Sequence, residues 1–216
     1  SESMFMLTGT PRGFVFSYAD RARGITEAML GKWDQAESFF RHSLVVMRTN
    51  SATRYLLGCC FLEANKLKMA AARMEESLLL DPDFRAPYGS LGVALLRLGD
   101  YDRVVSLSEA GLVRHPDSYH MRYNLGLAKF ALACRAEGLM GGGEAHKPNI
   151  ELRGEALEAL ESAKEGQTQA GEQLWAMRDD ELVAQLKCDS KPLMCPASDG
   201  GRPWDGWGWH FIGWRP

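Results

Sequence analysis

Four glycines recur at a constant interval of 34 residues along the chain: Gly24, Gly58, Gly92 and Gly126. Such a register is poorly explained by chance and marks an internal repeat. Placing each glycine eighth in its unit gives units at 17–50, 51–84, 85–118 and 119 onward. A unit of this size cannot bury its own apolar face, so several units must stack to form a common core.

Other columns of the repeat align without a gap through the first three units. Seven residues after the glycine come Gly31, Asn65 and Gly99, residue types that favour the left-handed conformation that ends many helices. Pro82 and Pro116 close the second and third units, where a helix has to stop. Apolar and small residues recur between these positions at steps of three and four, which predicts two amphipathic helices in each unit.

This pattern resembles the tetratricopeptide repeat (TPR) over about residues 17–140, and the stretch from Tyr88 to Tyr101 matches the family most closely. The resemblance implies an all-α fold, a right-handed superhelical solenoid of helix-turn-helix repeats. Small residues at the helix crossings let the backbones approach closely. Larger side chains there would overpack the crossing at a cost of about 1–3 kcal/mol.

The fourth unit begins on schedule, but its second helix is delayed. Residues 138–148 are rich in glycine and predict an inserted loop, and Asn149 is a candidate N-cap for a helix that runs to about residue 165. In that helix three residues repeat the spacing of Ala36, Phe40 and Ser43, namely Ala156, Leu160 and Ala163. This spacing comes later in the fourth unit than in the first, which predicts an insertion of about 18 residues. It forms either a tolerated surface loop or a loop that contacts a partner.

The expected organisation has four parts. Residues 1–16 form an N-terminal extension, 17–165 the TPR array with its fourth unit at 119–165, 166–187 a capping helix, and 188–216 an irregular tail. The tail is rich in Trp, Gly and Pro, and its apolar area is too large to remain in water. We expect it to pack on the chain's own groove or on another subunit, with a membrane interface as the weakest alternative. Its anchors are Trp204, Trp207, Trp209, Phe211 and Trp214.

Composition and motifs exclude several functions. A net charge of −3 at pH 7 provides no field that would recruit nucleic acid. The sequence contains no run of about 18 apolar residues, so it predicts no membrane span. Residues 1–16 lack the features of a secretory signal. There is no Walker loop, HExxH or CxxC motif, and Cys188, Cys195 and His210 lack a fourth zinc ligand. The sequence therefore predicts no enzyme activity, no cofactor and no metal.

The chain has five cysteines, an odd number, and three of them lie in apolar helical patterns: Cys59, Cys60 and Cys134. A disulfide framework normally uses an even set of cysteines in loops. We therefore expect reduced thiols and an intracellular, cytoplasmic protein.

In proteins that resemble this one, the first helix of each repeat lines a concave groove that binds a partner segment. The corresponding candidate residues are Tyr18, Arg21, Ile25, Tyr55, Leu56, Cys59, Leu62, Ser90, Val93, Arg97, His120, Tyr123, Asn124 and Leu127. Some of them are alternatively expected to pack between neighbouring repeats. The family's clamp for chaperone C-termini is missing, because its positions hold Arg21, Ile25, Leu56, Ala86 and Ser90.

The groove is instead mainly apolar and suits an extended or helical segment. The resemblance therefore implies a non-catalytic protein-interaction scaffold, a subunit that holds a partner segment within a multi-subunit assembly. The alternative is a transient adaptor or co-chaperone that binds client peptides without the clamp.

Overall fold

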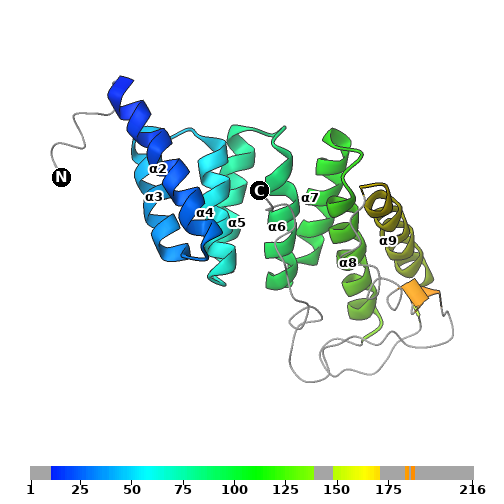
Figure 1. The fold of residues 1–216 in the computed structure, drawn as a ribbon. Coiled ribbons are helices and arrows are strands. Elements are labelled where there is room, and N and C mark those ends of the chain that lie inside the picture. Colours follow the sequence, from blue (N-terminus) through cyan, green and yellow to red (C-terminus); the bar gives the residue numbers. More distant parts are fainter. Residues whose placement is uncertain (1–10, 139–147, 171–182, 185, 188–216) are drawn as a thin grey trace. The chain divides into compact units, whose positions relative to one another are not determined.

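The structure is a computed structural model that describes residues 11–138, 148–170, 183, 184, 186 and 187. These residues form α-helices and no strands (Figure 1). In chain order the helices are α2 (Pro11–Met29), α3 (Trp33–Val46), α4 (Ser51–Glu63), α5 (Leu67–Leu80), α6 (Arg85–Leu98), α7 (Tyr101–Arg114), α8 (Tyr119–Ala136) and α9 (Ile150–Ala170). The chain divides into two compact units, residues 1–94 and 95–216, which are described separately below.

In the first unit, α2 packs on α3, α3 on α4, and α4 on α5. The repeat glycines lie at two of these contacts. A Cβ added at Gly24 would meet the ring of Phe40 at 2.7 Å, and one added at Gly58 would meet Cγ of Met74 at 2.8 Å. Both distances are shorter than real side chains tolerate, so glycine is required for the helices to approach this closely.

The turns between paired helices are also as the sequence predicts. Gly31, Asn65 and Gly99 adopt positive φ angles of 72°, 56° and 78°, the left-handed conformation that ends a helix. The first helix of the second repeat, α4, starts with a side-chain cap, since Asn50 Oδ1 accepts a hydrogen bond from the backbone N–H of Thr53 at 2.7 Å.

In the second unit, α8 packs against both α7 and α9. Helix α9 takes the place of the delayed second helix of the fourth repeat. A Cβ added at Gly126 would meet Leu160 Cγ at 2.6 Å. Leu160 lies 34 residues after Gly126, whereas Phe40 lies 16 residues after Gly24. Ala156, Leu160 and Ala163 are all buried, as are Ala36, Phe40 and Ser43 in the first repeat. The spacing predicted for the fourth repeat is therefore present in α9.

A buried ion pair joins the two ends of the inserted loop. Glu137, at the end of α8, accepts hydrogen bonds from Arg153 Nε at 2.7 Å and from the backbone N–H of Asn149 at 2.9 Å. Arg153 Nη2 lies 2.5 Å from Glu137 Oε2. Asn149 in turn caps α9, because its Oδ1 accepts the N–H of Leu152 at 3.1 Å. Both charged side chains are about 1% exposed, so water solvates neither charge well and each depends on the other.

This pair makes the stability of the second unit sensitive to acid. Burial by itself raises the pKa of Glu137, but the hydrogen bonds from Arg153 and Asn149 and the charge of Arg153 outweigh it and lower the pKa. A carboxyl whose folded pKa lies below its unfolded value stabilises the fold above the unfolded pKa and loses that contribution as the pH falls. We expect the free energy of unfolding to decline below about pH 4.5, near the ordinary pKa of Glu. Urea titrations across pH 3–7 would measure it, and Glu137→Gln should flatten the curve; equal slopes for variant and parent would contradict this origin.

Two expected boundaries are wrong. The sequence places residues 11–16 in the N-terminal extension, but they belong to α2, which begins at Pro11. Proline suits the first helical position, where its missing N–H costs no hydrogen bond. Helix α9 was expected to end near residue 165, but it continues to Ala170. It passes through Gly166, where an added Cβ would meet Tyr119 Cβ at 2.8 Å, so this glycine permits close contact with α8 rather than ending the helix.

The expected capping helix lies mostly outside the described residues. Of its described part, Leu186 is buried and Lys187 Nζ lies 2.7 Å from Glu161 Oε1 of α9. No helix among the described residues is long and apolar enough to cross a membrane.

Candidate partner-binding surface

Most of the predicted groove residues are buried. In the first unit these are Tyr55, Leu56, Cys59, Leu62, Ser90 and Val93, and in the second unit Tyr123, Asn124 and Leu127. Arg97 and His120 of the second unit are half-buried, and the His120 ring stacks on that of Tyr119 at a centroid distance of 4.0 Å. Their capacity to bind a partner stays a prediction.

Tyr55 illustrates the alternative role, packing between repeats. Its ring meets that of Phe84 edge to face, with the centroids 5.3 Å apart, and its hydroxyl lies 3.3 Å from Ser90 Oγ on α6. These contacts join the second repeat to the start of the third. Tyr55 therefore has a structural role whether or not it also contacts a partner.

The first repeat is different, because its predicted groove residues remain accessible. Tyr18 is 49% exposed, and Arg21 and Ile25 are half-buried. The Arg21 guanidinium carbon lies 5.1 Å from the centre of the Tyr18 ring, within the range of a cation–π interaction. A neighbouring face of α2 is packed, since Ser17 Oγ donates to the carbonyl of Ser43 at 2.9 Å and Gly24 meets Phe40.

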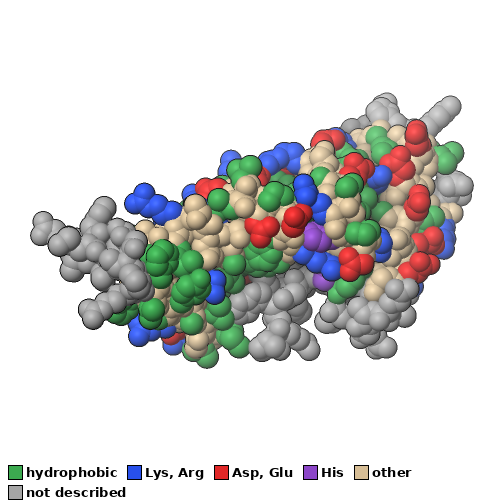
Figure 2. Space-filling view, turned by 90° about the horizontal axis from the view of Figure 1, so that it is seen from above, with side chains coloured by type: hydrophobic (Ala, Val, Ile, Leu, Met, Phe, Trp, Pro, Cys, Tyr) green, Lys and Arg blue, Asp and Glu red, His purple; other side chains and the backbone are tan. Residues whose placement is uncertain are grey.

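Further exposed residues continue this face along α2. Phe14 is 42% exposed and Met29 is 53% exposed, and both lie at helical spacing from Tyr18 and Ile25. Figure 2 shows hydrophobic side chains gathered over the N-terminal helices. We call this surface the α2 stripe; it comprises Phe14, Val15, Tyr18, Arg21, Ala22, Ile25 and Met29. The stripe is about 22 Å long, at 1.5 Å per residue.

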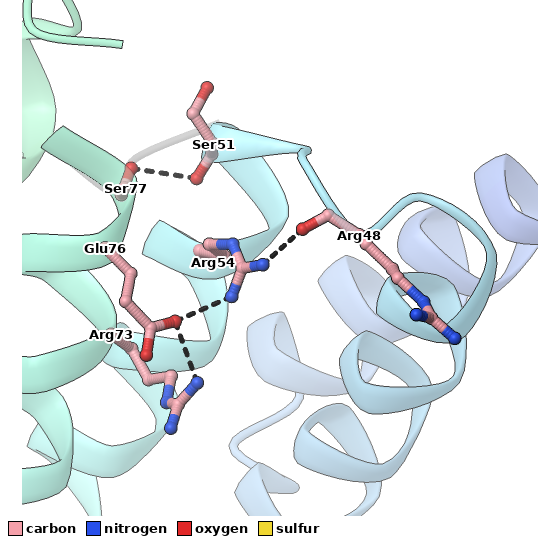
Figure 3. A network of polar contacts seen from close by, with 6 residues as sticks. All are labelled: Arg48, Ser51, Arg54, Arg73, Glu76 and Ser77. Atoms are coloured by element: carbon pink, nitrogen blue, oxygen red, sulfur yellow. Dashed lines mark hydrogen bonds and ion pairs between the residues drawn. The ribbon is translucent and has the colours of Figure 1, made fainter. Parts of the chain in front are cut away.

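A polar network that sequence reasoning missed fixes α4 against α5 (Figure 3). Glu76 Oε2 pairs with Arg54 Nη1 at 2.6 Å and with Arg73 Nη1 at 2.8 Å, while Arg54 also donates to the carbonyl of Arg48. Ser77 Oγ donates to the carbonyl of Ser51 at 2.8 Å. Arg54 and Glu76 lie 22 residues apart on different helices, so no local pattern links them. The network holds the start of the second repeat in place.

The two cysteines of the first unit, Cys59 and Cys60, lack the low pKa of a reactive thiol. Burial raises the pKa of Cys60 to about 12 and that of Cys59 further, so neither thiol ionises near neutral pH. Both are free, as expected. The expectation is wrong for Cys134, which is disulfide-bonded. A helical cysteine can pair with a distant segment that the tertiary fold brings near, and sequence spacing does not reveal such a pair.

The described residues hold no cluster of three or more His, Cys, Asp or Glu side chains that could bind a metal ion. The five tail anchors, Trp204, Trp207, Trp209, Phe211 and Trp214, lie outside the described residues, and so do Cys188, Cys195 and His210.

Comparisons with known proteins connect this arrangement to one fold. No protein-family model matches the sequence, and no curated protein matches it. Among solved structures, the chain is similar to MamA, with a TM-score of 0.58 and 18% identity over 72% of this chain and 80% of MamA. It is also similar to the Sgt2 TPR domain from Aspergillus fumigatus, with a TM-score of 0.56 and 17% identity over 65% of this chain and 91% of that domain.

A third similar structure is the first TPR of Spaghetti (RPAP3) bound to the HSP90 peptide SRMEEVD, with a TM-score of 0.53 and 17% identity. The match covers 56% of this chain and 98% of that domain. At these identities the similarity concerns the fold. The paired helices, the crossing glycines and these neighbours together show a TPR-like fold, an all-α helical solenoid.

Proposed function

We propose that this chain is a non-catalytic protein-interaction scaffold that holds a partner segment against the first helices of its repeats. The exposed α2 stripe is the observation that carries the proposal. A contiguous apolar face with a single charged residue is typical of a binding surface rather than of a solvated helix. Its helical spacing suits an apolar segment, either extended or helical.

The chemistry of the surface argues against chaperone C-termini as partners. The clamp positions hold Ile25, Leu56 and Ser90, which carry no charge, and Leu56 and Ser90 are buried. Of the five clamp positions, only the one that holds Arg21 could pair with a terminal carboxylate. We therefore propose a partner segment with apolar side chains, held through burial rather than through a clamped carboxylate.

The absence of enzyme activity is part of the proposal. The raised pKa values of the Cys59 and Cys60 thiols support it, because catalytic cysteines need a lowered pKa. We also propose that the scaffold works within a multi-subunit assembly. The buried thiols are consistent with the expected cytoplasmic location, whereas the disulfide of Cys134 argues against it, since that compartment keeps most thiols reduced.

The alternative function is a transient adaptor that binds client peptides. The neighbour that carries a bound peptide gives this alternative its support. The two functions differ in lifetime, so a partner that remains bound through a high-salt wash favours the scaffold, and loss in the wash favours the adaptor.

The test compares captured partners between the parent chain and two variants. Tyr18→Ser combined with Ile25→Ser removes apolar side chains from the α2 stripe, and we expect it to lose a partner that the parent retains. Leu79→Ser is the matched control, because Leu79 is 83% exposed on α5 and outside the stripe. Quantitative mass spectrometry of the captured proteins gives the readout, and the peptide SRMEEVD should not compete. A partner kept equally by all three proteins would contradict the proposed surface.

A further inference from the structure

The α2 stripe offers a partner very few hydrogen-bonding groups. Within it, only Tyr18 and Arg21 carry polar side-chain atoms. The backbone N–H and C=O groups in the interior of a helix bond to one another. On the same helix, the hydroxyl of Thr26 donates to the carbonyl of Ala22 at 3.1 Å. A segment that docks on the stripe therefore has to satisfy its own backbone groups.

This requirement favours a helical occupant over an extended one. An extended segment along a stripe of about 22 Å would contain about six residues. The N–H and C=O groups of that segment that face α2 would lose water and gain no partner, which costs free energy. A helix avoids this loss, because its backbone hydrogen bonds are internal. A helix as long as the stripe contains about 15 residues, or four turns.

The spacing of the stripe also fits a second helix. Its large apolar side chains recur at intervals of four and seven residues and so form a ridge along α2, namely Phe14, Tyr18, Ile25 and Met29. Ala22 lies between Tyr18 and Ile25 with a much smaller side chain. Helices pack by placing the ridges of one between the ridges of the other. A large apolar side chain of the partner would therefore lie over Ala22.

The single charge of the stripe determines which charge the partner should carry. Arg21 is half-buried, and its guanidinium carbon lies 5.1 Å from the centre of the Tyr18 ring, about halfway along the stripe. No carboxylate of the described residues forms an ion pair with Arg21. A half-buried cation gains more from an opposite charge than a cation in open water does. The position opposite Arg21 therefore favours an acidic side chain.

The same charge argues against a second copy of this chain as the occupant. Two α2 stripes packed antiparallel and centred on each other would bring their Arg21 residues together, because Arg21 lies near the middle of the range from Phe14 to Met29. Like charges placed opposite each other disfavour association. The partner that fits is therefore a different protein.

We propose that the α2 stripe binds an amphipathic α-helix of a partner protein, with large apolar residues at every third or fourth position and an acidic residue opposite Arg21. This inference rests on the proposed function for the identity of the binding surface. It adds the secondary structure and the charge of the partner segment.

Synthetic peptides test the proposal on the full-length chain. The first probe is a labelled helical peptide of about 16 residues, with leucine at every third or fourth position and one central glutamate beside the leucines. A second peptide has lysine in place of the glutamate, and a third has a central proline that breaks the helix. In fluorescence anisotropy titrations we expect saturable binding of the glutamate peptide. The lysine peptide should bind about fivefold more weakly and the proline peptide at least about tenfold more weakly.

Arg21→Glu in the full-length chain should reverse the preference, so that the lysine peptide binds more tightly than the glutamate peptide. Misfolding cannot produce this reversal, because it would weaken both peptides. Arg23→Glu is the matched control. Arg23 is exposed on the same helix, but residues two apart do not share a helix face, so the preference should stay that of the parent. Tyr18→Ser combined with Ile25→Ser should lose both peptides.

Three results would overturn the proposal. If the glutamate peptide shows no saturable binding up to about 1 mM, the stripe is covered by the chain itself or does not accept a helix. Equal binding of the proline peptide would reject a helical partner, and a preference unchanged by Arg21→Glu would reject the charge pairing. A dimer that Tyr18→Ser with Ile25→Ser abolishes, measured by sedimentation equilibrium, would assign the stripe to a second copy.

These outcomes are separate from those of the capture experiment above. A partner captured through the stripe while no peptide binds would keep the scaffold and reject the acidic helix as its partner. A reversed peptide preference without any partner captured through the stripe would keep the helix-binding surface and reject the scaffold.

Discussion

Replacing Glu137 by alanine is expected to lower the free energy of unfolding of the second unit by about 3–5 kcal/mol. The reason is the partner left behind. Arg153 is fully buried in α9, and its guanidinium would lose both hydrogen bonds to the carboxylate. The backbone N–H of Asn149 would lose its acceptor as well, at the start of the same helix. Urea denaturation followed by circular dichroism would measure the loss.

Two further variants separate a lost ion pair from a general packing defect. Glu137→Leu combined with Arg153→Met removes both charges together, and we expect it to recover most of the stability, because no unpaired charge remains buried. Glu161→Ala breaks the exposed pair with Lys187 and should cost less than about 1 kcal/mol. A Glu137→Ala variant as stable as the parent would show that water reaches this pair.

The second large effect is expected for Gly126→Leu. The added side chain would begin 2.6 Å from Leu160 Cγ, and the backbone nitrogen of Leu160 lies only 3.2 Å from the same point. A flexible side chain can turn aside, but the backbone of α9 cannot move without separating the two helices. We therefore expect a loss of about 1–3 kcal/mol or more, again from urea denaturation.

Gly154→Ala is the control for this prediction, because it changes another helical glycine of the same unit. A Cβ at Gly154 would have nothing within 4 Å, and the residue is exposed on α9. Alanine has the higher helix propensity, so this variant should gain up to about 1 kcal/mol. Opposite signs for the two substitutions are the expected outcome, and a Gly126 variant that gains stability would refute the close crossing of α8 and α9.

The repeat was predictable because its signals depend on backbone chemistry. Glycine is needed where two helices approach as closely as they do at Gly58, and a left-handed turn favours glycine or asparagine, as at Asn65, so both residue types mark their positions in the sequence. Asn149 was predictable in the same way, since a helix N-cap favours a short polar side chain. A different signal marks the start of α2, because proline is favoured at the first position of a helix and Pro11 occupies it.

The candidate site was only partly predictable. The groove positions come from repeat numbering, which gives the direction of a side chain but not what covers it. Tyr18 and Tyr55 illustrate this: Tyr18 lies at the second position of its unit and Tyr55 at the fifth, yet one is exposed and the other packs on Phe84. Tyr18 lies on α2 with its ring half exposed, whereas the Tyr55 ring meets Phe84 and its hydroxyl lies near Ser90 of the third repeat.

By itself the sequence determined the repeat, its turns and the place of the insertion, because these depend on residues close together in the chain or at a fixed interval. Only the tertiary structure revealed which charges are buried and which apolar faces stay open. In the sequence, Glu137 and Arg153 cannot be told from charged residues on a helix surface. Their burial depends on α8 and α9 meeting across the inserted loop. The α2 stripe stays open for the same kind of reason: burial depends on neighbours brought together by folding, which no local pattern records.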